Sequence, residues 1–343
     1  MKIPSMLSTA AVGLATLFPI QSALAVEPVN PKASPEARAI LSYLHEMSGK
    51  KVLAAQHGDT KEYEYVRETT GKDAAIRGTD FIFEYRNAQR VNDVIGWWKK
   101  GVIPSIMWHW GAPSKGEGYD QSKLKIDIDQ CFVPGTPEHK QMWGDMKRIA
   151  DHLTKLRDAK VPVIWRPMHE CSGGWFWYDM GGGDRFQRVW RTMYDYFTRT
   201  RQLNNLIWVL GYDGSPNKAF DPGSQFYDIV GSDTYDSRTD SHLDMFKQTR
   251  AVSEPSKLVA FHECGIPPDP ALAIADGAAW SWFMNWDQHV FRVDKAYLTK
   301  VYNSEFTVTL DELPKWSERI AKLQPTLTAS KKPVVAASKL KAK

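Results

Sequence analysis

The chain has 343 residues and a formal net charge of +4 at pH 7. This excess is local: residues 326–343 hold five lysines and no acid, and Lys2 lies at the start, which leaves −2 on residues 26–325. A body this close to neutral argues against nucleic acid or another polyanionic partner. A chain of this length can also bury a core large enough to be stable without disulfides.

Residues 1–25 have the pattern of a secretory signal peptide. Lys2 gives a positive start, an apolar stretch runs from Met6 to Phe18, and Ala23-Leu24-Ala25 forms a small-x-small end. We expect cleavage after Ala25 and a secreted or periplasmic protein. A membrane anchor is the alternative, but the apolar part is short for a span. No later stretch reaches the roughly 18 apolar residues that a membrane helix needs.

Residues 26–325 have a pattern of strands that alternate with helices. A first helix is predicted from Pro35, with Ser34 as its N-cap, to a stop at Gly49. Eight short apolar runs of strand type follow, at 52–56, 74–78, 102–108, 161–167, 205–211, 227–233, 257–262 and 279–286. Amphipathic helical segments separate most of them, at 90–100, 139–159, 184–203 and 242–250.

Continuous apolar strands between amphipathic helices are typical of a parallel sheet covered by helices. Eight such units in about 290 residues favour an α/β fold of the (β/α)8 TIM barrel type over an open doubly wound sheet. No Gly-x-Gly-x-x-Gly follows the first strand, which weakens the dinucleotide-binding alternative. We therefore predict one barrel domain over residues 26–325, and a disordered Lys-rich tail over residues 326–343.

Cysteine and tryptophan usage adds two expectations. The three cysteines, Cys131, Cys171 and Cys264, have no metal-binding spacing, and we expect buried free thiols. The chain also has 14 tryptophans, more than a core requires, and indole rings suit a site that grips flat apolar faces. Trp110 and Trp177 follow predicted strand ends, and either role, core or ligand contact, is open for them.

Polar and aromatic residues gather where the predicted strands end. They include His57, Trp108, His109, Trp110, His169, Glu170, Asp233, Tyr235, Glu263 and Trp286. In a barrel all these ends face one rim, where active sites lie. Residues far apart in the sequence are therefore expected to converge on one cleft.

Two of these residues, Glu170 and Glu263, follow the fourth and seventh strands. Paired carboxyls are what glycosidic cleavage needs, one to give a proton to the leaving oxygen and one to attack the anomeric carbon. Glu170 has Trp175 and Phe176 close in sequence, and apolar surroundings keep a carboxyl protonated near neutral pH. We assign Glu170 as the acid and Glu263 as the nucleophile. The alternative is a structural pair of carboxylates, bound to Arg166 or capping helices.

Two other hydrolase classes do not fit the motifs. His-Glu occurs at 169–170 and 262–263, but the zinc-peptidase pattern His-Glu-x-x-His is not completed, since Gly173 and Ile266 stand at the last position. No Gly-x-Ser-x-Gly supports a serine esterase. No cofactor and no metal are expected, because carboxyls supply both the proton and the nucleophile.

Four stretches carry a resemblance to a known family. They are "WHWGAP" (108–113), "RPMHECSGGWFWY" (166–178), "GSDTY" (231–235) and "HECG" (262–265). In this order and spacing they resemble glycoside hydrolase family 26, whose best-known members are endo-β-1,4-mannanases. The resemblance covers roughly residues 35–320.

The resemblance implies a retaining double displacement, with Glu170 as acid/base and Glu263 as nucleophile. It also implies that Tyr235 hydrogen-bonds the nucleophile and that Trp286 forms an aromatic wall. In all, the implied substrate contacts are His109, His169, Trp175, Asp233, Tyr235 and Trp286. One departure is Asp287, which stands where family members often carry a basic residue, and this puts the outer contacts in doubt.

Two further predictions concern an insertion and a histidine next to Glu263. Residues 115–140 form a long insertion that is expected to wall one end of the cleft. His262 precedes Glu263 by one residue, so strand alternation predicts a structural side chain that points away from the barrel interior.

The resemblance implies a β-linked polysaccharide as the partner of a monomer, with no nucleic acid or membrane. β-Mannan, galactomannan or glucomannan is the expected substrate. The alternatives are β-1,3-xylan or mixed-linkage β-glucan on the same fold, and a barrel that binds glycans without cleaving them.

Overall fold

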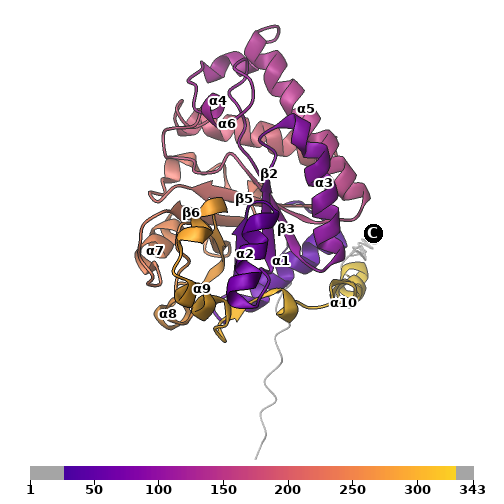
Figure 1. The fold of residues 1–343 in the computed structure, drawn as a ribbon. Helices are drawn as coiled ribbons and strands as arrows, with labels where there is room; N and C mark the ends of the chain where they lie inside the picture. The colour runs from indigo at the N-terminus through magenta and orange to yellow at the C-terminus, as the bar shows by residue number, and fades with distance from the viewer. Residues whose placement is uncertain (1–26, 330–343) are drawn as a thin grey trace, which may run out of the picture.

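The structure, a computed structural model that describes residues 27–329, is a closed barrel of eight parallel strands with helices outside it (Figure 1). β1 pairs with both β8 and β2, which closes the sheet. The barrel strands are β1 (Val52–His57), β2 (Ile76–Asp80), β3 (Ile103–Trp108), β4 (Val163–Pro167), β5 (Leu206–Tyr212), β6 (Ile229–Thr234), β7 (Leu258–Cys264) and β8 (Trp280–Asn285), and a short β9 (Thr307–Val308) pairs with β1 outside the barrel order. The predicted (β/α)8 TIM barrel is confirmed, and each predicted strand overlaps an observed one.

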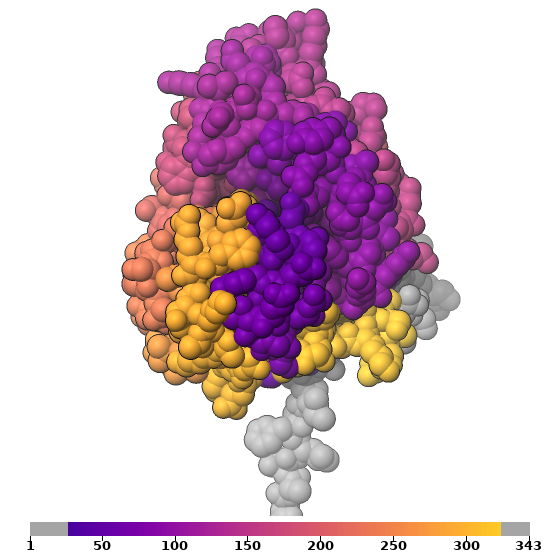
Figure 2. Space-filling model, viewed as in Figure 1, coloured from indigo at the N-terminus to yellow at the C-terminus, as the bar shows by residue number. Residues whose placement is uncertain are grey.

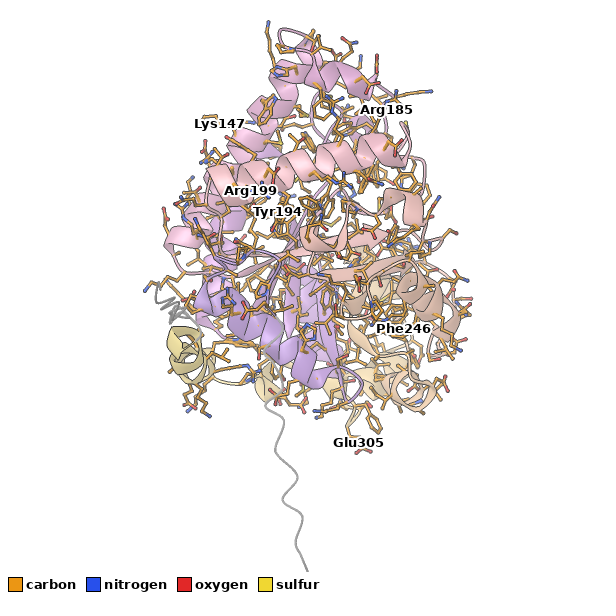
Figure 3. All side chains as sticks on the ribbon, turned by 180° about the vertical axis from the view of Figure 1, so that it is seen from behind. Lys147, Arg185, Tyr194, Arg199, Phe246 and Glu305 are labelled. Atoms are coloured by element: carbon orange, nitrogen blue, oxygen red, sulfur yellow. The ribbon has the colours of Figure 1, made fainter. Side chains whose placement is uncertain are left out.

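Helices occupy the connections between the strands. They are α1 (Pro35–Met47), α2 (Thr60–Thr70), α3 (Glu84–Lys99), α4 (Tyr119–Ser122), α5 (Pro137–Asp158), α6 (Gly183–Tyr194), α7 (Leu243–Ala251), α8 (Pro270–Asp276), α9 (Lys295–Tyr302) and α10 (Trp316–Ala329). A π-helical segment, Asp195–Thr200, continues α6. Figure 3 shows this long helix from behind, with Arg185, Tyr194 and Arg199 along it. Described residues include no helix of a length and apolar character that would cross a bilayer.

Alternation along each strand divides the apolar residues between two cores. In β4, Ile164 belongs to the cluster inside the barrel, whereas Trp165 belongs to the cluster between the sheet and the outer helices. The inner cluster continues onto the apolar face of α1, which contacts β5 and β8 and begins with the predicted Ser34 cap. Parity therefore also places Arg166, two residues after Ile164, inside the barrel.

The structure contains helices that the sequence analysis did not predict, among them α2, α8 and α9, and it moves the boundary of the predicted tail. α2 was not predicted, and its start is fixed by a capping box between Asp59 and Glu62, a sequence signal that would have found it. α10 extends to Ala329, so the first four residues of the predicted tail are helical, because the amphipathic pattern continues past residue 325. The predicted signal peptide and residues 330–343 lie outside the described residues. The three cysteines are buried and free, as predicted.

Gly231 in β6 allows the backbone of β7 and the His262 side chain to come close. A Cβ atom added there would lie 2.2 Å from the Ala260 carbonyl oxygen and 2.6 Å from His262 Nε2. Gly231→Ala should therefore lower the free energy of unfolding by about 2–3 kcal/mol, the usual cost of overpacking a core.

Gly144→Ala is the matched control. Gly144 lies within α5, and an added Cβ would meet only the tip of Arg148 at 3.8 Å. Alanine favours helix, so the unfolding free energy should stay the same or rise by about 0.5–1 kcal/mol. Denaturant unfolding followed by circular dichroism compares the two. Equal effects would contradict the close approach at Gly231.

Candidate active site

A cavity of about 570 Å³ opens at the carboxyl ends of the barrel strands. Residues from seven of the eight strand ends and their following loops line it, among them His57, Asp80, His109, His169, Glu170, Tyr235, Glu263 and Trp286. The expected convergence of strand ends on one cleft is therefore present. Of the residues assigned from the sequence, Trp175 and Asp233 do not line this cavity but contact residues that do.

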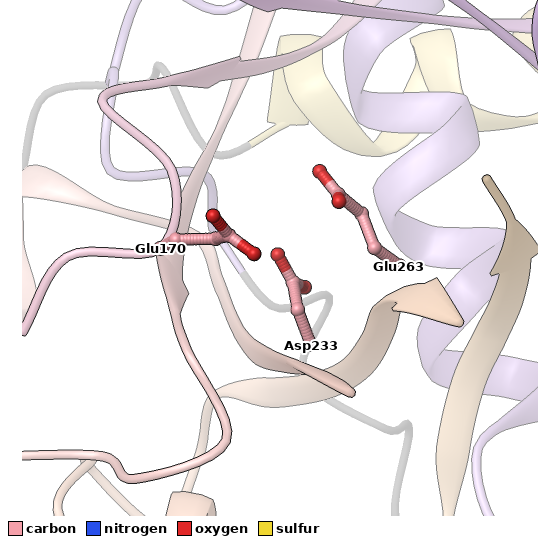
Figure 4. Close-up of side chains that lie close together, drawn as sticks. All are labelled: Glu170, Asp233 and Glu263. Carbon is pink, nitrogen blue, oxygen red and sulfur yellow. The ribbon is translucent and has the colours of Figure 1, made fainter. Parts of the chain in front are cut away.

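The two glutamates face one another across this cavity. Figure 4 shows the carboxyl groups of Glu170, Asp233 and Glu263 pointing toward a common centre from three different segments. One oxygen from each lies within 4.8 Å of the others. That spacing is close to the roughly 5–5.5 Å of retaining glycosidases and well below the roughly 6.5–9.5 Å of inverting ones.

The backbone after β4 is strained where it presents Glu170. Met168, Glu170 and Ser172 all have positive φ, at 48°, 51° and 81°. Each such non-glycine residue costs on the order of 1–2 kcal/mol. The neighbouring structure holds the segment: the Tyr178 hydroxyl donates to the His169 carbonyl at 2.8 Å, and the Cys171 amide donates to the Gly211 carbonyl of β5 at 2.9 Å. Strain of this kind concentrates at functional sites.

Glycines beside the aromatic run let Trp175 reach Glu170. The indole folds back over Gly173, where an added Cβ would lie 2.4 Å from the ring, and its Nε1 donates to Glu170 Oε2 at 2.9 Å. Burial, and then the negative charge of Glu263, raise the pKa of Glu170 to about 7, although the Trp175 hydrogen bond acts to lower it. Glu170 thus holds a proton near neutral pH, as a general acid must.

Glu263 is fixed by two donors, one for each carboxyl oxygen. Arg166 Nη2 donates to Oε1 at 2.5 Å, and the Tyr235 hydroxyl donates to Oε2 at 2.5 Å. The same Arg166 nitrogen donates to Asp233 at 2.7 Å, so one buried guanidinium joins two acids. The contact between Tyr235 and Glu263 has the geometry that the resemblance implied.

His262 was predicted to point out of the barrel, and this prediction is wrong. Its side chain lies in the barrel interior, with Nδ1 3.7 Å from Asp233 Oδ1 and its ring beside Gly211 and Gly231. Register shifts between β6 and β7 and between β7 and β8 interrupt the alternation, so His262 and Glu263 both face inward. Burial, and then the charge of Arg166, lower the pKa of His262 well below its usual value, which keeps it neutral.

Asp80, at the end of β2, binds His109, which in turn contacts His169. It accepts from the His109 amide at 3.1 Å and lies 2.5 Å from His109 Nδ1. Burial alone would lower the pKa of His109, but the charge of Asp80 outweighs it and the pKa is raised. His169, whose pKa burial lowers, lies 3.1 Å from His109 through their Nε2 atoms.

Other aromatic side chains divide between cavity and core. Trp286 stacks on His57, with ring centroids 4.0 Å apart, and both line the cavity. Trp110 and Trp177 are buried and hydrogen-bonded, to Asp145 and to the Trp110 carbonyl, so they belong to the core. Within residues 115–140, Tyr119 lines the cavity, and Ile128 and Cys131 pack into the core.

Sequence reasoning assigned no role to several residues of the site. His57 was named only among the strand-end residues, Asp80 was not considered, and Arg166 appeared only as a possible partner of structural carboxylates. A charged residue inside an apolar strand run was the available signal for Arg166. Asp287 also lines the cavity, and burial, followed by the charge of Glu62, raises its pKa to about 6.

Among the described residues, Glu170, Asp233 and Glu263 are the one group with the spacing of metal ligands. The Arg166 guanidinium already lies between two of them, at 2.5 and 2.7 Å. A fixed cation in this position repels a metal ion and occupies the oxygens that would bind it. The three carboxylates therefore form a site that binds the Arg166 guanidinium.

The profile of glycosyl hydrolase family 26 matches residues 29–312. The chain belongs to this family. It is 32% identical over 84% of its length to a mannan endo-1,4-β-mannosidase of Thermothelomyces thermophilus, of which it covers 64%. Two such enzymes of Piromyces sp. are 28% identical and are covered to 54% and 51%. The chain thus spans about one half to two thirds of these relatives.

Solved mannanase structures have the same fold as this chain. A β-mannanase from a symbiotic protist of the termite Reticulitermes speratus, complexed with a gluco-manno-oligosaccharide, is 33% identical with a TM-score of 0.75, and 84% of this chain covers 98% of it. The β-(1,4)-mannanase of Podospora anserina is 29% identical with a TM-score of 0.77, and 84% of this chain covers 69% of it.

Two substitutions should move the pKa of Glu170 in opposite directions. Glu263→Gln removes the like charge and should lower this pKa by about one unit or more. Trp175→Phe removes a hydrogen bond that stabilises the carboxylate and should raise it. Carbon-13 NMR titration of labelled glutamate carboxyls measures both, with Glu170→Gln identifying the signal.

Trp143→Phe, in α5 and in contact with Tyr196, is the control and should leave the pKa of Glu170 unchanged. A pKa of Glu170 near 4 in the unaltered protein, or one that neither variant moves, would contradict the electrostatic account of the pair.

Proposed function

We propose that this chain is a retaining endo-β-1,4-mannanase that cleaves β-mannan, galactomannan or glucomannan with Glu170 as acid/base and Glu263 as nucleophile. The observation that carries the proposal is that one oxygen of Glu170 and one of Glu263 lie within 4.8 Å of each other, in unlike surroundings. Glu170 has a pKa of about 7, whereas Glu263 binds Arg166 and Tyr235 through both oxygens. Two glutamates so close together are thereby suited to opposite tasks.

In the first step, a Glu263 oxygen attacks the anomeric carbon and the glycosidic C–O bond breaks. Glu170 gives its proton to the departing oxygen, so the leaving sugar departs as a neutral alcohol. Tyr235 and Arg166 hold the attacking carboxyl in place, which reduces the cost of orienting it. Loss of negative charge from Glu263 in this step lowers the pKa of Glu170, which makes the deprotonated acid ready for the next step.

In the second step, water attacks the same carbon and Glu170 takes the proton of that water. The bond to Glu263 breaks, and the sugar leaves with its original anomeric configuration. His109, His169 and Trp286 line the cavity beside the two acids, where they suit a pyranose with hydroxyl edges and an apolar face.

The preference for mannan rests on the relatives. Curated relatives from fungi and bacteria are named mannan endo-1,4-β-mannosidases, and one solved relative holds a gluco-manno-oligosaccharide. We further propose that the enzyme acts outside the cytoplasm, since residues 1–25 have the signal-peptide pattern. We also propose that it acts as a monomer.

Removing the two acids should have different consequences. Glu263→Ala should reduce turnover of mannan on the order of 10⁴-fold or more, because no group replaces the nucleophile. Glu170→Ala should reduce it about 10²–10⁴-fold on mannan, but far less on a dinitrophenyl manno-oligosaccharide, whose leaving group needs no proton.

Steady-state kinetics on both substrates measures these effects. Glu305→Ala, an exposed glutamate in the loop after α9, is the control and should keep full turnover. Near-normal mannan hydrolysis by Glu263→Ala would refute the assignment of the nucleophile.

A panel of polysaccharides tests the substrate. Release of reducing ends from mannan, β-1,3-xylan and mixed-linkage β-glucan should be greatest from mannan. Strong activity on one of the others alone would replace mannan as the substrate. Binding without any new reducing ends would identify a non-catalytic glycan-binding barrel.

A further inference from the structure

A second and larger hollow adjoins the active-site cavity. Its volume is about 910 Å³, and it is lined by residues of α2, of α3 and of the loop after β1, which we call the α2–α3 groove. Gly58, Asp59, Arg86 and Arg90 line both the cavity and the groove, so the two are continuous. α2 and α3 both lie on the face shown in Figures 1 and 2. A chain that leaves the cavity past Arg86 enters this groove.

The groove is positively charged, although the body of the protein is not. Its lining holds six cations, Lys61, Arg67, Arg77, Arg86, Arg90 and Lys100, and only three acids, Asp59, Glu64 and Asp93. Arg86 and Arg90 lie four residues apart on one face of α3. Two of the other cations have acidic partners outside the lining, since Arg77 binds Asp73 and Lys61 lies 3.3 Å from Glu62. A positive excess remains in the groove.

Part of this charge has no partner within the protein. Asp59 already binds both Arg86 and Arg90. Arg67 and Lys100 are exposed, and no acid among the described residues lies within ion-pair distance of either side chain. These two cations line the groove but not the cavity. An anionic ligand would meet them without displacing an internal ion pair.

Aromatic side chains accompany these cations. Tyr85 is 81% exposed beside Arg86, and the buried Tyr63 packs against Trp97 and under the Arg77 guanidinium, 4.5 Å from its ring centre. An exposed ring offers a surface for the C–H face of a sugar. The planar guanidinium group of arginine can donate two parallel hydrogen bonds to the two oxygens of a carboxylate. The volume also lies within the roughly 300–1,000 Å³ of ligand sites.

We propose that the α2–α3 groove binds the acidic part of a glycan, a segment bearing uronic-acid carboxylates, whose neighbouring sugars occupy the active-site cavity. This rests on the proposed function for the sugars in the cavity, and it extends the substrate class to acidic β-linked glycans. The continuity of groove and cavity favours a glycan over a free phosphate, because one chain can occupy both. The exposed Tyr85 gives a sugar ring a place that a phosphate would not use.

A matched pair of ligands tests the proposal. The probes are β-1,4-manno-oligosaccharides and the same oligosaccharides with part of their C6 hydroxyls oxidised to carboxylates. Binding is measured by calorimetric titration into the full chain carrying Glu263→Ala, because this substitution prevents turnover of the probes. The oxidised probe should bind at least about 5-fold more tightly at 0.05 M salt, and about 0.5 M salt should remove most of this gain, because the Debye length falls to about 4 Å.

Substitutions that remove charge show which cations cause the tighter binding of the oxidised probe. Arg67→Gln with Lys100→Gln should abolish most of the preference for the oxidised probe. Lys50→Gln with Lys155→Gln, two exposed lysines outside the groove, should leave it intact. Thermal unfolding verifies that both double variants fold.

The possible results separate this proposal from the proposed function. Equal binding of the two probes, or a preference that survives Arg67→Gln with Lys100→Gln, would contradict the proposed glycan site in the groove. Either result would leave the proposal of mannan cleavage untouched. A groove-dependent preference for the oxidised probe in a protein that releases no reducing ends from mannan would support the groove and reject the mannanase.

Discussion

One buried guanidinium organises the centre of this barrel. Arg166 lies inside, on the parity of Ile164, and a single nitrogen of it binds Asp233 and Glu263. A charge in such a place is expensive unless it is paired, and removing one partner of a buried pair is strongly destabilising. Because Arg166 must stay paired, this network holds the Glu263 carboxylate in a fixed position. The neutral His262 beside Asp233 adds no competing positive charge.

The asymmetry between the two glutamates follows from this network. Arg166 and Tyr235 bind Glu263, whereas Glu170 receives only the indole of Trp175 and lies near the charge of Glu263. The same residue type thus holds a proton at one position and serves as the bound carboxylate at the other. Strained backbone after β4 brings Glu170 to this place, and contacts from β5 and Tyr178 offset the cost.

Local sequence patterns predicted the scaffold well, because barrel strands are buried on both faces and read as apolar runs. The convergence of Glu170 and Glu263 followed from the rule that parallel strand ends share one rim. Prediction failed where the chain departs from regular geometry. A bulge turns Glu263 inward beside His262, which shares the inward parity of Ala260, and no periodicity reveals a bulge. Trp110 and Trp177 remained ambiguous because their partners, Asp145 and a backbone carbonyl, are set by tertiary packing.

Roles of single cavity residues depended on contacts between distant segments. Asp80 and His109 are 29 residues apart, and Arg166 and Glu263 are 97 apart. The sequence shows that these residues are present, but it does not show which of them contact one another. The α2–α3 groove likewise joins an unpredicted helix to a predicted one, so its charge could be recognised only in three dimensions.

The anomeric configuration of the first product tests the central claim most directly. Proton NMR at the start of manno-oligosaccharide hydrolysis distinguishes the two anomers before they interconvert. Two carboxyls within 4.8 Å leave no room for a water between nucleophile and sugar, so the β-anomer should appear first. Initial release of the α-anomer would mean that water attacks directly, and would contradict the assignment of Glu263 as a nucleophile.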